Sequence, residues 1–178
     1  MRLRHAAVLL PLWAACTACT PAEARVDSRV RMEHGITVGS HVSPTEVACL
    51  RGGTRSVGAE NDVQIVTFAT PYDCSECTPH LTGVSKVVKE VGLAGRAFWV
   101  VWSPNTRAVE QSLARSQPGF PVCVNEDGTL WDRHNLLHTP FTAVIRTGRV
   151  VYMHDGLVSR REDERQLAAD LKRLFAEE

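Results

Sequence analysis

The chain has 178 residues, of which 44% are hydrophobic and 22% are charged. A chain of this length forms about one domain with an ordinary buried core, and the composition excludes a disordered or collagen-like protein. Lys plus Arg and Asp plus Glu both number 20, so there is no basic excess of the kind that indicates nucleic-acid binding.

Residues 1–24 have the pattern of an export signal. A charged start precedes an apolar run of ten residues, which is too short to span a bilayer, and residues 22–24 fit the small-x-small rule for signal peptidase. The signal could also be of the lipoprotein type and end before Cys16 or Cys19, so lipidation and plain secretion both stay open. We expect an exported protein, either periplasmic or lipid-anchored to the outer face of a membrane.

Residues 25–60 contain scattered Gly, Ser and Arg, with short apolar alternations at residues 36–38 and 47–50. They predict a tether followed by an N-terminal β-hairpin. Residues 61–178 predict one α/β domain. It begins with a continuous apolar and β-branched run at residues 63–69, which is typical of a strand buried on both faces.

Apolar residues then recur at helical spacing from Leu81 to Val91, and Gly92 ends this pattern. Residues 97–102 predict a second buried strand, and a short helix is expected after Pro104. This alternation of strand and helix favours a parallel βαβ unit with a right-handed crossover.

The last third of the domain predicts strands at residues 120–124, 141–146 and 150–154, with a short helix at residues 131–137. Thr147-Gly148 between the last two strands indicates a tight hairpin. A capping box of Ser159 and Glu162 is expected to start a C-terminal helix, whose apolar stripe consists of Leu167, Leu171, Leu174 and Phe175.

Cys74 and Cys77 stand three residues apart, after the first buried strand and at the start of the following helix. Unpaired N–H groups and the helix dipole at that point favour a thiolate, which makes Cys74 a usable nucleophile near neutral pH. Cys77 lies one turn further along the same face, where it can attack a mixed disulfide and release the partner. The spacing suits two-step thiol-disulfide exchange.

Several segments together resemble thioredoxin-fold proteins of the exported TlpA/ResA-like branch, namely VQIVTFATPYDCSEC, AFWVVWSPN, FPVCVNEDGTL and TPFTAVIRTGRVVYMHDG. The resemblance covers roughly residues 60–178. It implies a thioredoxin-like fold with a central mixed sheet flanked by helices, and a thiol-disulfide oxidoreductase acting on protein thiols or disulfides with an electron-donating redox partner. No organic cofactor is required, because the disulfide itself carries the electrons.

The same resemblance assigns a substrate-positioning role to Thr139 and Pro140, with a cis peptide bond between them. Such a turn would present a backbone edge beside the thiols, where a substrate strand could pair.

The sequence departs from the family pattern around the cysteines. Tyr72-Asp73 replaces the usual Trp before the first cysteine, and the charges of Asp73 and Glu76 disfavour a thiolate, which indicates a more reducing couple. The acid that many thioredoxins carry in the preceding strand has no counterpart, since Thr67 and Phe68 stand in that region. These changes bear on catalytic efficiency rather than on the fold.

Two other functions stay open. A chaperone for copper or zinc would use four candidate ligands, Cys74, Cys77, His80 and His138. A non-catalytic thioredoxin-fold module would keep its cysteines as a static disulfide. Peroxidase chemistry is disfavoured, because Pro71 stands where the peroxiredoxin family needs Thr or Ser.

Cys49 and Cys123 lie outside the motif. In an oxidising compartment they fit a structural disulfide or two unrelated buried thiols, and Cys123 as a third redox thiol is a further interpretation. If Cys16 and Cys19 belong to the signal, the four remaining cysteines permit three pairings, among which sequence alone does not choose.

Overall fold

The computed structural model describes residues 35–70, 77–113 and 119–176, all within one compact unit. None of the helices in these ranges has the length and apolar character needed to cross a lipid bilayer. The elements in chain order are β1 (Thr45–Cys49), β2 (Thr54–Val57), β3 (Val63–Ala69), α1 (Cys77–Glu90), a 3₁₀ turn (Ala94–Arg96), β4 (Ala97–Trp102), α2 (Thr106–Leu113), β5 (Val122–Asn125), α3 (Thr129–His134), β6 (Phe141–Arg146), β7 (Arg149–His154) and α4 (Arg161–Phe175).

The strands form one mixed sheet in the order β2-β1-β5-β4-β3-β6-β7. β3, β4 and β5 run parallel, and all other neighbours pair antiparallel. The expected parallel βαβ unit is confirmed by β3, α1 and β4. The expected hairpin at Thr147-Gly148 is confirmed as well, since both residues have the positive φ that a tight turn between β6 and β7 needs.

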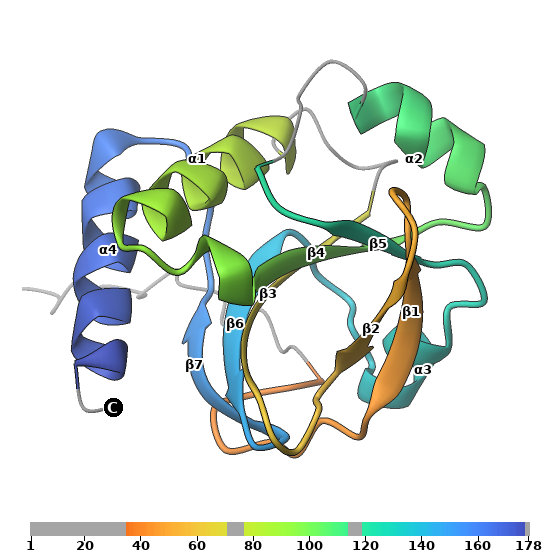
Figure 1. Cartoon of the computed structure of the whole chain (residues 1–178), viewed down its shortest axis with the longest axis horizontal. Coiled ribbons are helices and arrows are strands. Elements are labelled where there is room, and N and C mark those ends of the chain that lie inside the picture. The colour runs from red at the N-terminus through yellow and green to blue at the C-terminus, as the bar shows by residue number, and fades with distance from the viewer. Residues whose placement is uncertain (1–34, 71–76, 114–118, 177–178) are drawn as a thin grey trace, which may run out of the picture. The chain divides into compact units, whose positions relative to one another are not determined.

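Figure 1 shows that the sheet curls around one of its faces. The apolar alternation at residues 36–38 does not form a strand, and the segment at residues 36–42 turns through Gly39, whose φ is +94°. It then runs beside the β6–β7 turn, where the Val42 amide donates to the Gly148 carbonyl (2.8 Å). A Cβ on Gly58, just after β2, would come within 2.4 Å of the Val42 carbonyl oxygen. This segment therefore bridges the two edges of the curled sheet.

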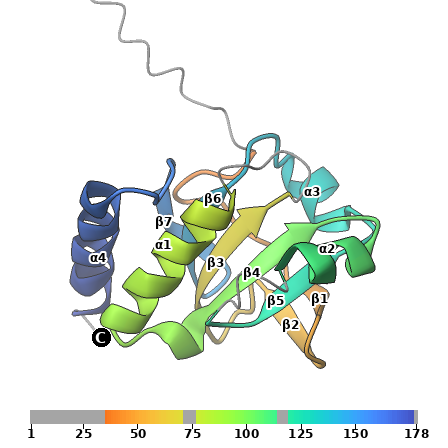
Figure 2. The same ribbon diagram turned by 90° about the horizontal axis from the view of Figure 1, so that it is seen from above.

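Two apolar cores lie on the two faces of the sheet, because the side chains of a strand point alternately to opposite faces. In β3, Ile65 and Ala69 belong to the outer core, which is covered by α1, α2 and α4 (Figure 2). Val66 and Phe68 belong to the inner core, inside the curl. The expectation that β3 and β4 are buried on both faces is confirmed.

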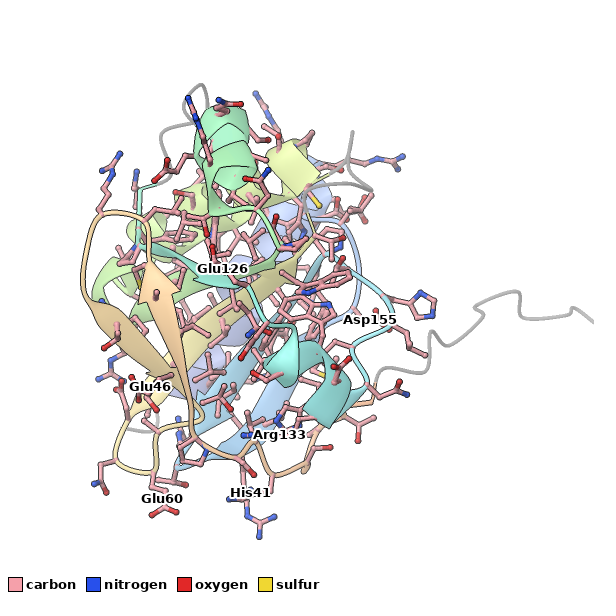
Figure 3. The ribbon with its side chains drawn as sticks, turned by 90° about the vertical axis from the view of Figure 1, so that its right-hand side faces the viewer. His41, Glu46, Glu60, Glu126, Arg133 and Asp155 are labelled. Carbon is pink, nitrogen blue, oxygen red and sulfur yellow. A yellow bond between two sulfur atoms is a disulfide. The ribbon has the colours of Figure 1, made fainter. Side chains whose placement is uncertain are left out.

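α3 closes the inner core at one end of the curl. It covers Thr129–His134 rather than the expected residues 131–137, because Asn135 adopts a left-handed conformation (φ 47°) that ends the helix. Arg133 on α3 donates from Nη1 to the Thr45 hydroxyl of β1 at 2.9 Å, which ties the helix to the N-terminal hairpin (Figure 3).

The N-terminal hairpin is joined to the sheet by a disulfide between Cys49 and Cys123, which are 74 residues apart in sequence. β1 and β5 share two residue pairs, and Cys49–Cys123 is one of them. The Leu50 amide donates to the Val122 carbonyl (2.9 Å), so the two cysteines form a non-hydrogen-bonded pair, the arrangement that brings opposite side chains closest. Cys123 is fully buried and Cys49 is half-buried.

The start of α4 differs from the expected capping box of Ser159 and Glu162. The helix begins one residue later, and the Arg160 amide donates to Oδ2 of Asp163 at 3.0 Å. A capping box has two hydrogen bonds, and one of them needs an acceptor on the N-cap side chain. Since an arginine side chain has no acceptor atom, only the bond from the Arg160 amide to the Asp163 side chain forms.

Candidate functional site

The ends of β3 and β6 meet beside the start of α1. Phe68 pairs with Phe141 in the register of these strands. Thr70 and Thr139, just beyond the strand ends, therefore lie opposite each other, with their hydroxyl oxygens 2.9 Å apart. The peptide bond between Thr139 and Pro140 is cis. The two residues expected to position a substrate backbone thus lie at the carboxyl end of β3.

Cys77 is the first residue of α1 and is only 6% exposed. Its Sγ lies 3.5 Å from the carbonyl oxygen of Thr70. Cys77 is disulfide-bonded, and because Cys49 and Cys123 bond to each other, its partner is not among the described cysteines. Cys74, the expected nucleophile, lies outside the described residues.

The surroundings of Cys77 favour an uncharged sulfur. A cavity of about 30 Å³ lies beside it, lined mainly by apolar side chains that include Ala69, Leu81, Val101 and Val109. The Thr70 carbonyl oxygen can accept a hydrogen bond from a thiol, whereas a thiolate has no proton to offer it. This environment suits a resolving cysteine better than an exposed nucleophile.

His80 is fully buried and bridges three segments. Its Nδ1 accepts a hydrogen bond from the Val158 amide (3.0 Å), which places the ring proton on Nε2. Nε2 lies 3.3 Å from Oγ1 of Thr142, and that hydroxyl lies 2.9 Å from the hydroxyl of Thr67. Burial, and secondly the nearby His154, lower the pKa of His80 to about 3, so the ring is neutral at physiological pH.

These contacts bear on the four candidate metal ligands. Both ring nitrogens of His80 are engaged inside the protein, whereas His138 is exposed. Within residues 35–70, 77–113 and 119–176, no group of three or more His, Cys, Asp and Glu side chains is placed to hold a metal ion. No observation in the described residues favours the metal alternative.

We expect acid to destabilise the protein through His80. The pKa is 6.5 for an ordinary histidine and about 3 in the folded state, so the unfolded chain binds the proton first as the pH falls. The stabilisation is complete above about pH 6.5 and is lost progressively below it, by about 2 to 3 kcal/mol between pH 7 and pH 4.5. Urea unfolding at both pH values measures this loss.

The His80→Gln variant is the control for that measurement, because glutamine does not titrate. Its loss of unfolding free energy between pH 7 and pH 4.5 should be smaller than that of the wild type by about 2 kcal/mol. Equal losses in the two proteins would contradict the assignment to His80. The pKa values of His134 and His154 are also lowered by burial, and these two histidines are present in both the wild type and the His80→Gln variant.

The sequence analysis named His80 only as a candidate metal ligand and missed its place in the core. The signal was present, since His80 shares the apolar face of α1 with Val84 and Val87 at helical spacing. Thr67 and Thr142 gave a matching signal, because each is a polar residue flanked by apolar residues within a strand that is buried on both faces.

The sheet order, the cysteine-bearing helix after the central strand β3, and the cis-proline at the start of β6 together define a thioredoxin fold. No model of a known protein family matches the sequence, and no curated protein matches it.

Solved structures share this fold. The thioredoxin domain of a thiol-disulfide oxidoreductase from Bacteroides vulgatus is 14% identical, with a TM-score of 0.62 over 78% of this chain and 98% of that chain. A secreted Mycobacterium tuberculosis disulfide oxidoreductase, homologous to E. coli DsbE, is 14% identical, with a TM-score of 0.57 over 72% and 95%. The peroxidoxin BcpB from M. tuberculosis is 17% identical, with a TM-score of 0.59 over 79% and 98%. Since both redox classes share the fold, the reaction must be argued from the site.

Proposed function

We propose that the chain is an extracytoplasmic thiol-disulfide oxidoreductase, which exchanges disulfides with protein partners through Cys74 and Cys77. The observation that carries the proposal is the place of Cys77, a disulfide-bonded cysteine at the first residue of α1, 3.5 Å from the Thr70 carbonyl oxygen. Thr70 in turn touches Thr139, so the disulfide, the end of β3 and the proline segment are contiguous. The order of motifs, which resembles the TlpA/ResA-like branch, supports the same reaction.

In the reducing direction, the Cys74 thiolate attacks one sulfur of a partner disulfide. The partner's other sulfur leaves as a thiolate and takes up a proton. Cys77 then gives its proton to solvent and attacks the Cys74 sulfur, which releases the second partner thiol. The partner gains two electrons and two protons, and the chain becomes the disulfide. A dithiol redox partner restores the reduced pair by the reverse exchange.

Thr139 and Pro140 are proposed to position the substrate backbone. Both are half-buried and follow the exposed residues 137 and 138, so this segment borders solvent beside Cys77. An extended partner segment that pairs with this backbone gains main-chain hydrogen bonds, which depend little on the partner's sequence. The arrangement therefore fits protein substrates with diverse side chains.

The extracytoplasmic location rests on two supports. Structural disulfides such as Cys49–Cys123 persist in oxidising compartments and are rare in the cytosol. Residues 1–24, which lie outside the described residues, have the pattern of an export signal. A lipid anchor at Cys16 or Cys19 is the membrane-bound form of the same proposal.

The reduction potential of the Cys74–Cys77 pair tests the proposed function. The protein is equilibrated with glutathione and dithiothreitol buffers, and thiol labelling is read peptide by peptide, so that these two cysteines are followed separately from Cys49 and Cys123. We expect a reversible couple more reducing than glutathione, because Asp73 and Glu76 disfavour the thiolate. A pair that stays oxidised in both buffers would instead indicate the static module.

A further inference from the structure

A buried histidine anchors α1 to the rest of the protein. The His80 side chain is 0% exposed, and a buried polar group is costly unless its hydrogen-bonding atoms are paired. Both ring nitrogens are paired, Nδ1 with the Val158 amide and Nε2 with the Thr142 hydroxyl. His80 therefore joins α1 to β6 and to the loop before α4 at the same time.

The backbone of α1 also approaches that loop very closely. A Cβ on Gly83 would lie 2.0 Å from the carbonyl oxygen of Val158, so only glycine fits there. Gly83 stands three residues after His80 on the helix, and the two residues meet the carbonyl and the amide of the same loop residue. This double contact leaves α1 little freedom to slide along the sheet.

The residue that His80 contacts on the sheet, Thr142, belongs to β6. β6 pairs with β3, and these two strands end at the candidate site. Thr142 pairs with Thr67 in the register of β6 and β3, and their hydroxyls are 2.9 Å apart. The same strands end at Thr70 and at the proline segment. Cys77 precedes His80 by three residues, a rise of about 4.5 Å along α1. His80 thus holds the cysteine-bearing turn of α1 against the paired strands β3 and β6, whose ends lie at the candidate site.

We propose that His80 is a positioning residue for thiol exchange, which fixes the Cys77 sulfur beside the Thr70 carbonyl oxygen and thereby stabilises the reduced, protonated state of Cys77. This inference rests on the proposed function, because it concerns the same cysteine pair. In the disulfide-bonded form described here, Cys77 Sγ lies 3.5 Å from that carbonyl oxygen and has no proton to donate. Reduction adds the proton, so a thiol held at this position can donate a hydrogen bond to the carbonyl. Releasing α1 from Thr142 weakens this hydrogen bond, which only the reduced form can make, so the couple becomes more reducing.

The test measures the equilibrium constant between the cysteine pair of the full-length protein and dithiothreitol, by peptide-resolved labelling of Cys74 and Cys77. Reversible exchange by the wild type comes first. A wild-type pair that never exchanges overturns the proposed function and this inference with it. If the wild type exchanges and the variants do not shift, only the role of His80 is overturned.

His80→Leu and Thr142→Val each remove the hydrogen bond between α1 and β6 and keep the apolar volume. We expect both to favour the disulfide form about tenfold, equivalent to a reduction potential roughly 30 mV lower. The glutamine of His80→Gln can accept a hydrogen bond from the Val158 amide and donate one to Thr142. The equilibrium constant of this variant should therefore lie within about threefold of the wild-type value. If His80→Leu does not fold, Thr142→Val and His80→Gln decide the question.

Gln64→Leu is the matched control. Gln64 is also buried on β3 and makes two side-chain hydrogen bonds, to the Gly58 amide (2.9 Å) and the Ser56 carbonyl (2.6 Å), but at the end of the strand away from Thr70. We expect this variant to lose unfolding free energy and to keep the wild-type equilibrium constant. An unchanged constant in folded Thr142→Val, or an equal shift in Gln64→Leu, overturns the positioning role.

Discussion

Replacing Cys74 by Ser is expected to slow the reduction of insulin disulfides by dithiothreitol at least about 100-fold, because a hydroxyl at this position cannot replace the attacking thiolate. Replacing Cys77 by Ser should instead trap a mixed disulfide between Cys74 and insulin. The different outcomes follow from the site, since Cys77 is 6% exposed and faces an apolar cavity and a carbonyl oxygen. Turbidity measures the rate, and non-reducing electrophoresis with mass spectrometry measures the trapped species.

A variant with both Cys49 and Cys123 replaced by Ala is the control for this experiment. It also loses two cysteines, but these join β1 to β5, and two strands (β5 and β4) separate β1 from β3. It should reduce insulin at close to the wild-type rate at a temperature where it is folded. If Cys74→Ser trapped a mixed disulfide with insulin and Cys77→Ser did not, Cys77 would be the attacking cysteine and Cys74 the resolving one.

Removal of the Cys49–Cys123 disulfide is expected to lower the free energy of unfolding by about 4 kcal/mol. The bond closes a long loop, since the cysteines are 74 residues apart, and cross-linking over such a distance strongly restricts the unfolded chain. The bond also holds a hairpin whose pairing with β5 comprises two residue pairs. Urea unfolding of the double alanine variant and of the oxidised wild type measures the difference.

Hydrogen exchange locates the effect of that disulfide. Without it, the amides of β1 and β2 should exchange faster than those of β3 and β6, because the hairpin loses its covalent link to the sheet. A loss of less than about 1 kcal/mol, or equally faster exchange in β3, would contradict the role of the disulfide as a local staple.

The sequence alone determined the elements whose signals are local. The strand at Val63–Ala69, the strand at Ala97–Trp102 and the tight turn at Thr147-Gly148 all lie where the sequence predicted them. Continuous apolar runs, helical spacing and turn residues act over a few neighbouring positions, so they can be recognised without knowing the rest of the fold. The thioredoxin-like order of elements followed from these signals and from the motifs that resemble the family.

The pairing of residues that are distant in the sequence depends on the tertiary fold. The fold joined Cys49 on β1 to Cys123 on the neighbouring strand β5, although the sequence permitted other pairings. It also placed His80 in the core against Thr142 and Val158, residues 62 and 78 positions away. No local pattern specifies such contacts. The disulfide depends on the register between β1 and β5, and the His80 contacts depend on the close approach of α1 to β6 and to the loop before α4.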